Sequence, residues 1–71
     1  MTIELTKEDK AAIVNQHLKD LAYTEYNLEL NLIEINASTT PNQDNLDSVN
    51  NQLQDINKRK AALQAELDSL S

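Results

Sequence analysis

Two carboxylates, Glu25 and Glu29, stand one helical turn apart and are the first side chains to consider for chemistry. Such a pair could serve acid–base catalysis or bind a cation. The second half of the chain offers no matching pair of ligands at that level, and the sequence has no cysteine to add a thiolate. We therefore interpret Glu25 and Glu29 as structural residues and predict no metal site around them.

The single histidine, His17, is equally isolated. A helical metal site would need a carboxylate or another imidazole one turn away, as in the Glu-x-x-His motif. Val14 and Leu21 occupy the nearest positions on the same side, and Asp20 is the one acidic residue in reach. A hydrolytic triad would need a shaped pocket, which a glycine-free chain of this kind does not suggest. We expect a protein that is not an enzyme, with no cofactor and no small-molecule substrate.

The charge balance bears on possible partners. The chain has 12 acidic residues against 6 lysines and arginines, a net charge of −6, and one basic run, Lys58-Arg59-Lys60. Phosphate contacts need clustered cations, and anionic membranes also attract basic segments. We therefore expect neither nucleic acid nor a membrane as the partner. No apolar stretch reaches transmembrane length and no secretory signal is recognisable, which predicts a cytoplasmic protein, or one of the host cytoplasm if the chain is phage-encoded.

The elements that must position these side chains follow from two apolar stripes. Both stripes advance by alternating steps of three and four residues, and each includes one charged member. The first stripe is Ala11, Val14, Leu18, Leu21, Glu25, Leu28, Leu32 and Ile35. The second stripe is Leu46, Val49, Leu53, Ile56, Lys60, Leu63, Leu67 and Leu70. If the chain folds back at Pro41, each member of one stripe meets one member of the other. This pattern predicts an all-α fold, an antiparallel two-helix hairpin with a coiled-coil seam.

We predict a single domain over residues 1–71, with a first helix over about 6–36, a turn over about 37–40 and a second helix over about 41–70. Thr6 is a favourable N-cap because acidic residues follow it in the first turn. For the second helix, Thr40, Pro41 and Gln43 match a capping box with proline at the first helical position.

The charged members of the two stripes fall close to each other in this register. Glu25 lies opposite Ile56, and Lys60 lies opposite Leu21, so the two charges can meet diagonally across the seam. We interpret Glu25 and Lys60 as a pair that fixes the register of the helices at some cost in stability. The alternative interpretation is a buried pair that handles protons.

One group of apolar residues in the first helix does not belong to the seam. Tyr23, Tyr26, Leu30 and Ile33 also advance by threes and fours, on a face well round the helix from the stripe. The second helix has no matching row. Although scattered apolar residues are normal on surfaces, a contiguous patch usually marks a contact site.

We therefore expect a non-enzymatic protein–protein interaction or assembly module that acts through the outer face of the first helix. Its partner would be a second copy, which would give a homodimeric four-helix bundle, or a helix of another protein. The composition, small, acidic and free of cysteine, suits a phage or bacterial accessory protein.

In length and topology the expected hairpin is similar to Rop, a small RNA-binding helical hairpin that dimerises into a four-helix bundle. No motif is shared, and the acidic first helix lacks the basic and aromatic face that the Rop family uses. The resemblance implies an alternative function, a nucleic-acid-binding regulator. In that case binding would depend on Lys58 and Arg59 and would be sensitive to salt.

Overall fold

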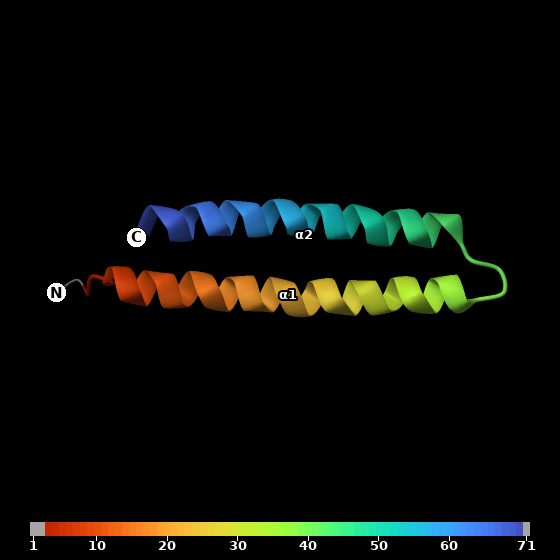
Figure 1. Ribbon diagram of the computed structural model, residues 1–71, viewed down its shortest axis with the longest axis horizontal. Helices are drawn as coiled ribbons and strands as arrows, with labels where there is room; N and C mark the ends of the chain where they lie inside the picture. The colour runs from red at the N-terminus through yellow and green to blue at the C-terminus, as the bar shows by residue number, and fades with distance from the viewer. Residues whose placement is uncertain (1–2, 71) are drawn as a thin grey trace.

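The computed structural model describes residues 3–70. Most of these residues form two long helices that lie antiparallel (Figure 1). Helix α1 spans Lys7–Ala37 and helix α2 spans Gln43–Leu70. Residues 38–42 join them at one end, and the start of α1 and the end of α2 lie at the other end. The molecule is a rod with extents of 59 × 20 × 15 Å. The predicted antiparallel hairpin is confirmed.

The core is the line of contact between the two helices. The two apolar stripes contain sixteen residues, and all of them are buried or half-buried, whereas every other described residue is exposed. Leu28, Val49 and Ile56 are the most deeply buried. The half-buried side chains of Leu21, Leu32, Ile35 and Leu53 pack around these three. The coiled-coil seam therefore lies where the sequence pattern predicted it, and it is a narrow core only one layer deep.

Helix α1 begins with a reciprocal cap. The backbone N–H of Asp9 donates to Thr6 Oγ1 at 3.0 Å, and the backbone N–H of Thr6 donates to Asp9 Oδ2 at 3.1 Å. Two N–H groups that the helix itself cannot satisfy thereby find acceptors. The predicted cap at Thr6 is confirmed, and Asp9 occupies the position that glutamate or glutamine takes in most such boxes.

The start of α2 differs from the prediction. Asn42 caps the helix: its Oδ1 accepts from the backbone N–H groups of Asp44 at 2.9 Å and Asn45 at 3.3 Å. Gln43 turns into the helix and donates to Asp47 Oδ1 at 2.9 Å. The predicted capping box from Thr40 to Gln43 is therefore wrong.

The physical reason for this difference lies in the weak local preference. Asparagine and threonine rank close together as N-caps, so the geometry of the connection decides between them. Starting the helix at Gln43 leaves five residues, 38–42, to cross from one helix axis to the other. Pro41 lies in this connection, before the cap, instead of at the first helical position.

Candidate functional site on the outer face of α1

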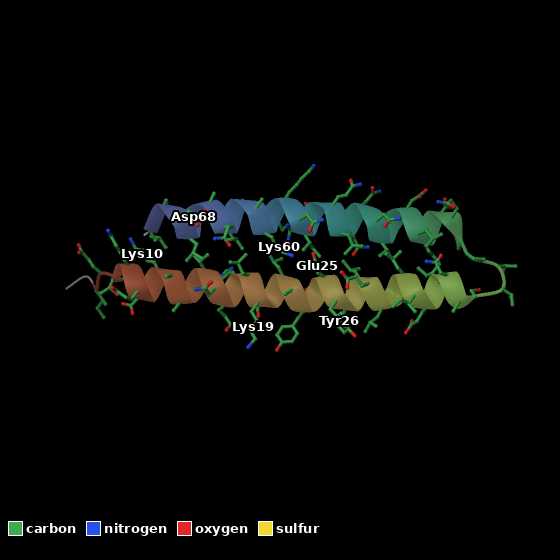
Figure 2. The ribbon with its side chains drawn as sticks, viewed as in Figure 1. Lys10, Lys19, Glu25, Tyr26, Lys60 and Asp68 are labelled. Atoms are coloured by element: carbon green, nitrogen blue, oxygen red, sulfur yellow. The ribbon has the colours of Figure 1, made fainter. Side chains whose placement is uncertain are left out.

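The outer row, which we define as Tyr23, Tyr26, Leu30 and Ile33, is exposed in the hairpin, with Leu30 less exposed than the other three. The exposed fractions of these side chains are 61%, 62%, 36% and 63%, respectively. Figure 2 shows Tyr26 pointing away from α2, on the same side of α1 as Lys19. The predicted surface is thus an exposed apolar row over about three turns of one helix.

The direction of the outer row follows from helix geometry. Successive residues of a helix are turned by about 100°. Viewed down the axis of α1, the centre of the outer row therefore lies roughly 140–160° from the seam residues at the same height. Helix α1 therefore has two apolar faces on nearly opposite sides, and α2 can cover only one of them. The outer face of α2 is different in kind, since Asp47, Asn51 and Gln54 there are polar and exposed.

The charged residues of the seam form an ion pair between the two helices. Lys60 Nζ lies 3.1 Å from Glu25 Oε2 and 3.2 Å from Oε1, and both side chains are about two-thirds covered or more, with exposed fractions of 35% and 23%. Figure 2 shows both side chains in the space between the ribbons. The predicted diagonal contact is confirmed. Its role in fixing the register stays a prediction.

The basic run does not form a cationic face. Successive residues on a helix point about 100° apart, so the three side chains diverge. Lys60 enters the seam, Arg59 Nε lies 2.9 Å from Asp55 Oδ2 on the surface, and Lys58 is exposed. Two of the three cations thus have a carboxylate partner within the hairpin, and an exposed pair of the Arg59–Asp55 kind contributes little to stability.

One edge of the seam carries a groove that the sequence pattern did not predict. Two open hollows of about 670 and 410 Å³ share Thr24 and Arg59 as lining residues and are therefore neighbours along the rod. His17 and Asp20 line one end, and acidic residues of α2 line the other. The groove could not be found from periodicity, because its shape depends on how long side chains lie across the edge of the helix pair.

No constellation for metal binding is found in the described part of the chain. Among residues 3–70, no group of three or more histidine, cysteine, aspartate or glutamate side chains is placed to hold a metal ion. Glu25 binds Lys60 instead of facing Glu29, which is exposed, and His17 is exposed at the groove. Neither of the two described helices combines the length and apolarity needed to cross a membrane.

The chain was compared with protein families, curated proteins and solved structures. No protein-family model, no curated protein and no solved structure matches the chain. The class of protein is therefore defined by the structure alone, as an antiparallel helical hairpin with one uncovered apolar row.

Proposed function

We propose that this chain is a non-enzymatic protein–protein interaction or assembly module and that the outer row is its contact surface. The observation that carries the proposal is the exposure of four consecutive row members, two of them tyrosines, on a face of α1 that helix geometry turns away from α2. Tyrosine is enriched at protein interfaces because its ring is apolar and its hydroxyl can still meet a polar group.

The size of the patch supports a contact role. A fully buried aromatic side chain covers about 150–250 Å², so a tyrosine that is three-fifths exposed presents roughly 100–150 Å². With Leu30 and Ile33, the outer row presents roughly 400 Å² of apolar surface. This value lies within the ~300–600 Å² of the largest patches on monomeric proteins, which are often functional. Here the whole patch is concentrated on one helix of a 71-residue chain.

Both partners that the sequence allows fit such a surface. A second copy of the chain would present the same row, and a helix of another protein could lay its own apolar face along it. In either case Tyr26 and Leu30 lie at the centre of the contact, where substitution by a charged residue is expected to disrupt it most.

Affinity capture of the tagged chain from its native cells tests this proposal. We compare the wild type with Tyr26→Asp/Leu30→Asp, which places two charges in the row. The matched control is Gln54→Asp/Asn57→Asp, which adds the same charge to exposed positions of α2.

We expect the wild type and the α2 control to capture the same specific partner and the row variant to lose it. This partner can be another protein or a second copy of the chain. Equal retention by all three chains would contradict the proposal. Far-UV circular dichroism of each variant shows whether the hairpin is still folded.

A further inference from the structure

We propose that the partner of the outer row is a second copy of this chain, with α1 packed antiparallel on α1 about a two-fold axis at the level of residue 28. This inference rests on the proposed function, since it names the partner of the same surface. It adds the orientation, the register and the order of the helices in the dimer.

The spacing of the row supports this register. The steps from Tyr23 to Tyr26, Leu30 and Ile33 are three, four and three residues, a sequence that is the same in both directions. An antiparallel copy therefore places every row member opposite another. Tyr23 faces the second copy's Ile33, and Tyr26 faces the second copy's Leu30. Each tyrosine ring thus packs on an aliphatic side chain, and each of these contacts occurs twice, as an isologous interface requires.

The charges next to the row favour the antiparallel orientation. Lys19 falls opposite the second copy's Ala37 and so lies within one helical turn of that copy's Glu34. Neither Lys19 nor Glu34 forms an ion pair with another described residue of the hairpin. Asp20 lies further round, at the groove, where Gln16 Nε2 donates to its Oδ1 at 2.9 Å. A parallel pair of helices would instead bring Lys19 to Lys19 and Glu34 to Glu34.

The buried area is consistent with a weak dimer. Two rows of roughly 400 Å² give roughly 800 Å² from apolar side chains, and the polar residues beside them bring the total to about 1,000 Å². This is the lower limit for a specific interface and belongs to complexes that dissociate readily. We therefore expect association at micromolar to millimolar concentration.

The position of the row also fixes the order of the four helices. Because the row and the seam lie on nearly opposite sides of α1, the second copy's α1 packs across from α2 and not beside it. The four helices then form a layer in the order α2, α1, α1, α2. This arrangement differs from a square four-helix bundle, in which each helix faces neighbours about 90° apart and all share one core.

Distance measurement between spin labels tests the orientation. The chain has no cysteine, so a single Ala12→Cys substitution at an exposed position of α1 carries one label per copy. At 1.5 Å per residue, the proposed register separates the two labels by about 48 Å along the axis. A parallel dimer would place them within about 20 Å, because packed helices lie 8–10 Å apart.

We expect a distance near 48 Å that disappears when Tyr26→Asp/Leu30→Asp is added. A short distance, a distance that survives these substitutions, or the absence of dipolar coupling at millimolar concentration would each overturn the self-pairing. The proposed function fails separately, when the capture experiment shows no difference between the row variant and its α2 control.

A matched pair of charge removals tests the register. The two Glu29 side chains lie on the same flank of the dimer, about 3 Å apart along the axis, and repel each other. Glu34 instead lies near Lys19 of the other copy. By sedimentation equilibrium, Glu34→Gln should raise the dimer dissociation constant about threefold to tenfold, and Glu29→Gln should lower it about twofold to fivefold. Both variants lose one negative charge, so a change in the same direction for both would overturn the register.

Discussion

Replacing Ile56 by alanine tests the seam at its most buried point. Ile56 is 5% exposed and packs in one cluster with Leu28 and Val49. Removing the side chain beyond Cβ takes away apolar contacts with both helices. It also leaves a space that the surrounding side chains can fill only in part.

The magnitude follows from burial and from the shape of the rod. Truncation of a buried isoleucine to alanine costs about 2–5 kcal/mol, and the value is smaller where the site can collapse. The hairpin is only 15 Å across in its thinnest direction, so the helices can close on the space and water can enter it. We therefore expect a loss of about 2–3 kcal/mol. A single core in a chain of this length rarely supplies more than about 3–5 kcal/mol, so the loss is a large fraction of the total stability.

Urea unfolding followed by circular dichroism measures this loss. Both chains carry Tyr26→Asp/Leu30→Asp, so that dimer formation does not add to the apparent stability. We expect the midpoint to fall while the m-value stays the same. The neighbouring exposed residue provides the control: Asn57→Ala should change stability by no more than about 0.5 kcal/mol. A loss below about 1 kcal/mol for Ile56→Ala, or an equal loss for the control, would refute the register of the seam.

Four further predictions concern the seam pair, the cap of α2 and nucleic acid. Glu25→Leu/Lys60→Leu should raise the free energy of unfolding by about 1 kcal/mol or more, because two half-buried charges give way to apolar packing; denaturant unfolding measures the gain, and a loss of stability would contradict it. The same variant should show several slowly exchanging sets of NMR resonances, because a single register is no longer specified, and one sharp set would argue against the register role. Asn42→Ala should lower the free energy of unfolding by about 1 kcal/mol, and Thr40→Ala should lower it by less than about 0.5 kcal/mol, because only Asn42 caps the helix. A larger loss for Thr40→Ala than for Asn42→Ala would indicate that Thr40 is the N-cap. An electrophoretic shift assay at low salt should show no binding of RNA or DNA, and a salt-sensitive shift would favour the nucleic-acid alternative.

The seam could be predicted from the sequence because its pattern is redundant. Sixteen positions obey one spacing rule, and the charged members Glu25 and Lys60 fall where a diagonal contact is possible. A slip of fewer than seven residues would expose many apolar side chains at once, whereas a slip of a full heptad would keep most of them paired and would separate Glu25 from Lys60. Long-range packing and local periodicity therefore predict the same seam residues, and these are the residues that the structure buries or half-buries between the helices.

The helix ends were less predictable, because competing caps differ by only a few tenths of a kcal/mol. No other residue near Thr6 is an equally suitable N-cap, and the prediction that Thr6 caps α1 is confirmed. At the start of α2, Thr40 and Asn42 are both suitable caps, and the path of the connection selects Asn42. Such a choice depends on the distance between two helix axes, which the local sequence does not encode.

The outer row could be predicted only as the apolar residues of α1 that remain after the seam residues have been assigned. Tyr23, Tyr26, Leu30 and Ile33 have the spacing of a helix face, but the pattern alone does not say whether another element covers them. The structure answers this for the described part of the hairpin, because all four are exposed. The edge groove beside Thr24 and Arg59 has no periodic pattern and could not be found in this way.

Sedimentation equilibrium of three chains from about 10 µM to 1 mM tests most directly whether the outer row pairs with a second copy. These are the wild type, the row variant Tyr26→Asp/Leu30→Asp and the α2 control Gln54→Asp/Asn57→Asp. If the outer row is a contact surface for a second copy, the wild type and the α2 control approach the dimer mass with rising concentration, and the row variant remains a monomer. A wild type that stays monomeric throughout, or a row variant that associates as strongly as the α2 control, would contradict the account.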